Sequence, residues 1–154
     1  MKKVLIFGAV KHVIKKAKEL GYETIVIDQY PNIACIKQAD KFKNISFEAY
    51  EECLQYAREE HVDGVVTATE FAVLTASYVA NKMNLPGLDF EVAKLVKSKY
   101  EIRKKMQEKY ITNVPQFYEV SKIEELYEIK IKKKLQIYLK HFNGLECLFC
   151  YKFI

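Results

Sequence analysis

The run Val4-Leu5-Ile6-Phe7-Gly8 is the stretch that decides the fold of this chain. A short apolar run without polar alternation, ended by a glycine, is typical of a strand buried on both faces. A helix is predicted next, because apolar residues recur at helical spacing at Val13, Ile14, Ala17 and Leu20. Gly21 then stands where the C-terminus of such a helix is expected. The opening therefore predicts a buried strand followed by an amphipathic helix.

The same alternation continues to about residue 88. Apolar, β-branched runs predict three further strands at residues 24–27, 42–45 and 64–67. Helical spacing predicts helices at 48–60 and 71–83, and residues 85–88 are a short fifth strand or a turn. Strands that alternate with helices imply right-handed crossovers and parallel pairing. We therefore predict an α/β fold, a three-layer doubly wound parallel sheet.

The local signals weaken after residue 109. Residues 114–120 are compatible with one strand, and Ser121 is a candidate cap for a helix through Glu124 and Glu125. Residues 129–154 have no consistent helical or strand period, so they are predicted to form a short irregular C-terminal extension. The expected divisions are 1–97 for the sheet domain, 98–128 for a linker helix and the start of the next domain, and 129–154 for an atypical tail.

Composition narrows the class of protein. Half of the 154 residues are hydrophobic, which excludes a disordered chain. The net charge is +5, but acidic and basic residues are interleaved, so we expect no nucleic-acid partner. No apolar run approaches the ~18 residues that span a bilayer, and the N-terminal run lacks a cleavage site. Four cysteines without a secretion signal read as reduced thiols, so a cytoplasmic location is expected.

A ligand site is expected at the carboxyl edge of the sheet. In open parallel sheets, ligands bind where the strand order reverses, here between the first and fourth strands. A glycine, backbone amides and charged side chains would meet there. The predicted substrate-binding residues are Gly8, Ala9, His12, Asp28, Thr69 and Glu70. No catalytic residue is assigned.

The sequence also contains partial signals for a dinucleotide site and for a zinc site. A dinucleotide site needs Gly-x-Gly-x-x-Gly, and Val10 stands where the second glycine should be. Cys147-x-x-Cys150 has metal-like spacing, but zinc needs four ligands and only His141 lies nearby. We therefore predict no metal site.

Several ordered features extend the pattern across residues 2 to 127. After the first strand and helix come Val26-Ile27-Asp28, Asp63-Gly64-Val65-Val66-Thr67, Leu85-Pro86-Gly87, the segment 99–103 and Val114-Pro115. This series resembles the N-terminal, Rossmann-like domain of ATP-grasp ligases of the carbamoyl-phosphate synthase, biotin carboxylase and phosphoribosylglycinamide synthetase type. The resemblance implies that the first domain contributes to the acceptor site and that Lys99 reaches the phosphates of ATP. It also implies ATP and Mg²⁺ as cofactors, with phosphorylation of a carboxylate followed by attack of an amine or another nucleophile.

The sequence departs from that family after Val114. The family's ATP-binding part needs a lysine-bearing strand, a glycine-rich flap and acidic Mg²⁺ ligands. Tyr138-Leu139-Lys140 is similar to the lysine strand, but His141-Phe142-Asn143-Gly144 does not continue the pattern. We therefore expect a truncated or frame-shifted fragment that is inactive alone and holds no cofactor tightly. The expected partners are a small carboxylate or amine substrate and either a homodimer mate or a separate ATP-grasp chain. Half of a split ligase and a stand-alone Rossmann-like domain for a small metabolite or nucleotide are the alternatives.

Overall fold

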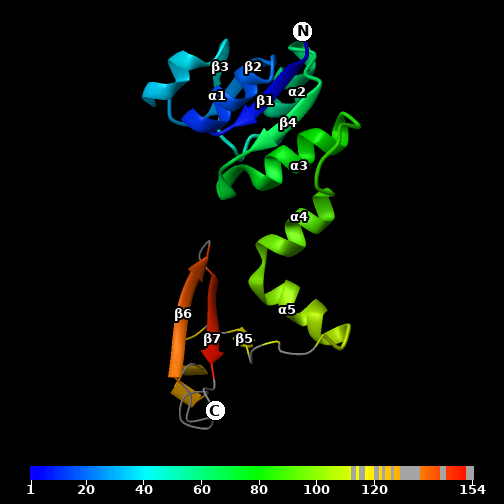
Figure 1. Ribbon diagram of the computed structural model, residues 1–154. Helices are drawn as coiled ribbons and strands as arrows, with labels where there is room; N and C mark the ends of the chain where they lie inside the picture. The colour runs from blue at the N-terminus through cyan, green and yellow to red at the C-terminus, as the bar shows by residue number, and fades with distance from the viewer. Residues whose placement is uncertain are drawn as a thin grey trace. The chain divides into compact units, whose positions relative to one another are not determined.

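The computed structural model describes residues 1–111, 114, 117–119, 122, 124–125, 127–128, 136–142 and 145–151. The chain divides into two compact units, Met1–Lys94 and Leu95–Ile154. In Figure 1 the first unit contains β1 (Lys3–Phe7), α1 (Lys11–Glu19), β2 (Glu23–Asp28), the 3₁₀ helix η1 (Ala34–Gln38), β3 (Lys41–Asn44), α2 (Tyr50–Glu59), β4 (Gly64–Thr67), the 3₁₀ helix η2 (Glu70–Ala72) and α3 (Val73–Lys82). Helix α4 (Phe90–Lys97) runs across the division. The second unit continues with α5 (Lys99–Glu108), β5 (Phe117–Glu119), β6 (Gln136–Phe142) and β7 (Leu145–Tyr151).

The sheet of the first unit is parallel, with the strand order β3-β2-β1-β4. Strand β1 pairs with β2 on one side and with β4 on the other, so the order reverses at β1. This is the Rossmann-like arrangement that the strand–helix alternation predicts, and the prediction of the fold class is confirmed. Residues 85–88 form no strand, and the chain bends at residues 86 and 87. The carboxyl ends of β1 and β4 therefore lie side by side at the switch point.

The core has two layers, because side chains of a strand point alternately to opposite faces. On one face, Leu5, Phe7, Ile25 and Ile27 pack with residues of α2 and α3. On the other face, Ile6 and Val26 pack with Ile14 of α1. All six strand residues are fully buried. Helices therefore cover both faces of the sheet, which gives the three layers.

Helix α1 is well defined at its C-terminal end. Gly21 has φ +80°, its N–H donates to Lys18 O at 2.9 Å, and Tyr22 N–H donates to Ala17 O at 3.1 Å. These two bonds make a Schellman motif, whose left-handed position favours glycine. The prediction of Gly21 as the end of the helix is confirmed.

The second unit contains a three-stranded antiparallel sheet with the order β5-β7-β6. The prediction of an irregular extension is therefore wrong for Gln136–Phe142 and Leu145–Tyr151. Both strands mix apolar and polar residues without strict alternation, which hid them from a period count. The missed signal is Asn143-Gly144 between the strands, since this dipeptide favours two-residue hairpin connections. The strand predicted at 114–120 is present as Phe117–Glu119, and Ser121 lies outside the described residues.

The predicted domain boundaries at residues 97 and 128 stay predictions. In the part of the chain that the structure describes, no helix is both long and apolar enough to cross a bilayer.

Candidate functional site

The loops after β1 and β4 touch at Gly8 and Thr69. Gly8 is buried and has φ +88°, and a Cβ on it would lie 2.8 Å from Thr69 Cγ2. A glycine is required there twice over, because the left-handed backbone disfavours a side chain and there is no space for one. The two loops that the sequence places at the switch point are thus held in direct contact.

Asp28 joins the end of β2 to the same loop. One carboxylate oxygen accepts a hydrogen bond from Ala9 N–H at 2.7 Å, and the other accepts one from Tyr30 N–H at 2.9 Å. Asn44 Nδ2 also donates to the main-chain oxygen of Asp28 at 2.8 Å. The buried carboxylate therefore satisfies backbone amides of two loops, which fixes the shape of the carboxyl edge. Its predicted contact with a substrate stays a prediction.

Two residues that the sequence analysis did not assign to the site also hold these loops. The hydroxyl of Thr67 lies 3.1 Å from both Phe7 O and Thr69 O, and Thr69 N–H donates to it at 3.2 Å. Cys35 is half-buried, and its thiol donates to Ala9 O at 3.0 Å. A threonine at the end of β4 was the available signal for Thr67. Nothing in the local sequence links Cys35 to Ala9, since they lie 26 residues apart.

The N-terminus of α1 opens at this edge without a cap. Val10 is the N-cap residue and makes no side-chain capping bond, and the first turn carries Lys11 and His12 but no carboxylate. Within the described residues, the N–H groups of Lys11 and His12 have no hydrogen-bond acceptor. Free amides and the positive end of the helix dipole favour an anion here. The two basic side chains add positive charge to the same turn, and a bound anion would balance it. The arrangement is therefore suited to a carboxylate or phosphate group.

The other predicted site residues are more exposed. His12 and Glu70 are exposed, and Ala9 and Thr69 are half-buried. Phe71, next to Glu70, is 77% exposed. The structure therefore brings Gly8, Ala9, Asp28 and Thr69 together, while His12 and Glu70 stand at the surface of the same loops.

Lys99 belongs to the second unit. It is the first residue of α5, directly after Ser98, whose hydroxyl accepts a hydrogen bond from Glu101 N–H at 3.2 Å. Its predicted place on a helix is confirmed, and its role with ATP stays a prediction. Among the described residues, no three His, Cys, Asp or Glu side chains lie close enough to hold a metal ion. Cys147 and Cys150 lie on β7, whose side chains are outside this description.

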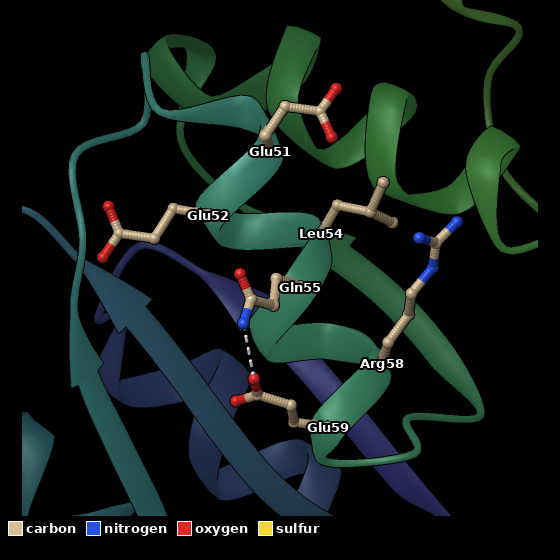
Figure 2. Close-up of a pocket in the computed structure, with 6 residues that line it drawn as sticks. All are labelled: Glu51, Glu52, Leu54, Gln55, Arg58 and Glu59. Atoms are coloured by element: carbon tan, nitrogen blue, oxygen red, sulfur yellow. Dashed lines mark hydrogen bonds between the residues drawn. The ribbon is translucent and has the colours of Figure 1, made fainter.

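A shallow hollow also runs along the outside of α2. Figure 2 shows that its six lining side chains all come from that helix: Glu51, Glu52, Leu54, Gln55, Arg58 and Glu59. Gln55 Nε2 donates to Glu59 Oε1 at 2.8 Å, while Glu51 and Glu52 leave the first turn in different directions. Because these polar groups diverge, the hollow does not bring chemistry together as the carboxyl edge does.

The fold defines a Rossmann-like α/β domain whose strand order reverses at β1. Comparison with known proteins makes the assignment more specific. Residues 14–87 match the model of the ATP-grasp N-terminal domain, so over this range the chain is similar to that family. The resemblance inferred from the sequence is confirmed.

Solved structures agree with this assignment at the level of fold. Phosphoribosylglycinamide synthetase from Anaerococcus prevotii has a TM-score of 0.73 and 23% identity, over 99% of this chain and 46% of that one. L-amino acid ligase from Bacillus licheniformis has a TM-score of 0.72 and 23% identity, and the match covers 97% of this chain and 39% of that one. N5-carboxyaminoimidazole synthetase from Staphylococcus aureus, complexed with ADP, has a TM-score of 0.77 and 15% identity, and the match covers 99% of this chain and 48% of that one. The chain thus spans less than half the length of these enzymes. No curated protein matches it in sequence.

Proposed function

We propose that this chain is the substrate-binding N-terminal domain of a cytoplasmic ATP-grasp ligase that joins a carboxylate to an amine or a thiol. Its carboxyl edge, with Gly8, Ala9, His12, Asp28, Thr69 and Glu70, would bind and orient the acceptor. The family match over residues 14–87 supports the class of enzyme. The strand reversal at β1 supports the position of the site.

One observation carries the proposal: the uncapped N-terminus of α1 beside the contact between Gly8 and Thr69. Unbonded amides in a first turn that also bears Lys11 and His12 need a hydrogen-bond acceptor from outside the helix. An anionic group of the acceptor substrate would supply it. The loop contact and the Asp28 bonds hold these amides in place before the acceptor arrives, which reduces the ordering cost of binding.

ATP and Mg²⁺ are the cofactors that the similarity to this family implies. ATP would supply the phosphoryl group that activates a carboxylate, and Lys99 is the residue of this chain proposed to contact its phosphates. Among the described residues, no three His, Cys, Asp or Glu side chains lie together, and no residue of this chain is assigned to Mg²⁺. The work of this chain in the reaction is to bind and orient the acceptor.

The test is a binding measurement with small anions. We would titrate the full chain with glycine, L-aspartate and ribose 5-phosphate by calorimetry, and repeat it with Lys11→Ala and with Lys15→Ala. Both variants remove one positive charge from α1. Lys15 lies beyond the first turn, and its Nζ is 3.8 Å from a carboxylate oxygen of Glu19. Lys11→Ala should weaken binding about fivefold, a typical effect of one exposed charge at a helix N-terminus. Equal affinities for the two variants would count against the site, and so would no binding of any of the three anions.

A second measurement addresses activity. The purified chain should show no acceptor-dependent ATP hydrolysis, because phosphoryl transfer depends on positioned metal ions and cations around the phosphates. Steady-state turnover with a pool of carboxylate and amine metabolites would contradict this. Turnover that Lys99→Ala abolishes would instead favour the split ligase.

A further inference from the structure

A second hollow in the first unit lies where the start of α2 meets α3 and α4. It is lined by three aromatic rings, those of Tyr50, Tyr78 and Phe90, and by the carboxylates of Glu48, Glu51 and Glu52. No residue of the carboxyl-edge site lines it. A function for this hollow is therefore independent of the function proposed above.

The rings form a compact group. Their centroids are 5.5 Å apart for Tyr50 and Tyr78, 5.3 Å for Tyr78 and Phe90, and 6.1 Å for Tyr50 and Phe90. Phe90 meets both tyrosines edge to face, at 67° and 86°. All three side chains are half-buried, so part of each ring remains accessible to solvent. The hollow thus has an apolar wall made of π surfaces.

The charged residues that line this hollow are all acidic, although the chain carries a net charge of +5. Neither lysine nor arginine lines the hollow. The Glu51 carboxylate accepts a hydrogen bond from the Tyr78 hydroxyl, while the carboxylates of Glu48 and Glu52 have no ion-pair or hydrogen-bond partner within the described residues. Elsewhere in the first unit, Glu19 and Glu60 each pair with a lysine. Figure 2 shows Glu51 and Glu52 extending outward from the first turn of α2.

The protein's own lysines show that the faces of these rings accept cations. Lys94 Nζ lies 4.3 Å from the centroid of Phe90, and Lys82 Nζ lies 5.6 Å from that of Tyr78. No described cation lies over Tyr50. An aromatic wall with unpaired carboxylates beside it attracts a cation that can use both.

We infer that this hollow binds a guanidinium group, with its plane against the aromatic wall and its charge beside the acidic residues Glu48 and Glu52 that line the hollow. A guanidinium is planar, weakly hydrated and able to stack and donate at the same time. An alkylammonium group is more strongly hydrated and makes fewer directed hydrogen bonds.

The test uses L-argininamide and its isostere L-citrullinamide, in which a neutral urea replaces the guanidinium, titrated into the full ¹⁵N-labelled chain. L-argininamide should move the amide resonances of residues 48–52, 78 and 90. L-citrullinamide has the same α-amine but a neutral urea of nearly the same shape as the guanidinium, and it should bind at least about tenfold more weakly, the effect of losing about 1.4 kcal/mol. Equal affinities for the two would overturn the inference and leave a neutral apolar groove. The absence of shifts at these residues with L-argininamide would overturn it as well.

Two variants locate the contact. The double variant Glu48→Gln/Glu52→Gln should weaken binding of L-argininamide about tenfold, since it removes the two negative charges beside the bound cation that have no partner of their own among the described residues. Glu59→Gln is the matched control, because Glu59 lies on the same helix but does not line this hollow. An equal loss with Glu59→Gln would attribute binding to the general field of the helix and overturn the site. Glu48, Glu52 and Glu59 are all exposed, so these variants leave the core intact.

Discussion

The contact between Gly8 and Thr69 gives the sharpest prediction, because the structure separates its two contributions. Gly8→Ala places a methyl group on a backbone with φ +88°, and that methyl group would lie 2.8 Å from Thr69 Cγ2. The left-handed backbone costs about 1–2 kcal/mol for an L-residue. The overlap adds about 1–3 kcal/mol, the usual range for an overfilled site. The free energy of unfolding should therefore fall by about 2–5 kcal/mol.

Gly21→Ala is the matched control. Gly21 has φ +80°, but a Cβ there would have no atom within 4 Å. Only the backbone contribution of about 1–2 kcal/mol should be lost. The difference between the two variants measures the contact between the loops.

A third variant tests the partner atom. Thr69→Ser removes Cγ2 and leaves Cβ at 3.4 Å, which is close to ordinary contact. In the Gly8→Ala background it should recover about 1–2 kcal/mol, a coupling typical of residues in contact. Urea denaturation followed by circular dichroism gives the free energies of unfolding of the wild type, Gly8→Ala, Gly21→Ala and the double variant Gly8→Ala/Thr69→Ser. If Gly8→Ala costs no more than Gly21→Ala, or if Thr69→Ser recovers nothing, the two loops do not touch as described.

Three further predictions concern other parts of the first unit. The Lys18 ammonium lowers the pKa of Asp40 from 3.8 to about 2, so this carboxylate stabilises the fold above pH 4 and loses the effect as the pH falls toward 2. Because the Asp40 side chain is 40% exposed, the difference in unfolding free energy between wild type and Asp40→Asn should shrink by only about 1 kcal/mol between pH 5 and pH 2, and an unchanged difference would refute the pairing. Burial raises the pKa of Cys53 to about 12, so alkylation mapped by mass spectrometry at pH 8 should label the half-buried Cys35 first, and faster labelling of Cys53 would disagree. Removal of all residues after Lys109 should leave the melting temperature of the sheet domain nearly unchanged, because its core clusters lie within residues 4–85, and a large drop would show that the later residues belong to that core.

The strands and helices of the first unit were predictable because each has one dominant local signal. Continuous apolar runs placed β1 and β2 within one residue of their observed bounds, and Gly21 marked the end of α1. The sheet order followed from the alternation of strands with helices. The hairpin of β6 and β7 was missed because its strands lack a clean period, although Asn143-Gly144 pointed to it.

The candidate site was predictable in position but not in detail. The switch-point rule located Gly8, Thr69 and Asp28 at one edge. It did not show that both Asp28 oxygens accept bonds from backbone amides, because one partner, Ala9, is 19 residues away in another loop. A polar side chain at the end of a strand looks the same in the sequence whether it faces a ligand or a neighbouring amide.

The most direct test of the central claim is a map of where an acceptor binds. Amide chemical shifts of the full ¹⁵N-labelled chain would be followed during titration with glycine, L-aspartate and ribose 5-phosphate. We expect the largest shifts at Ala9 to His12 and at Thr69 and Glu70, in the loops after β1 and β4. The proposed site would be contradicted if the amide resonances of these residues did not change and the largest changes fell elsewhere in the chain.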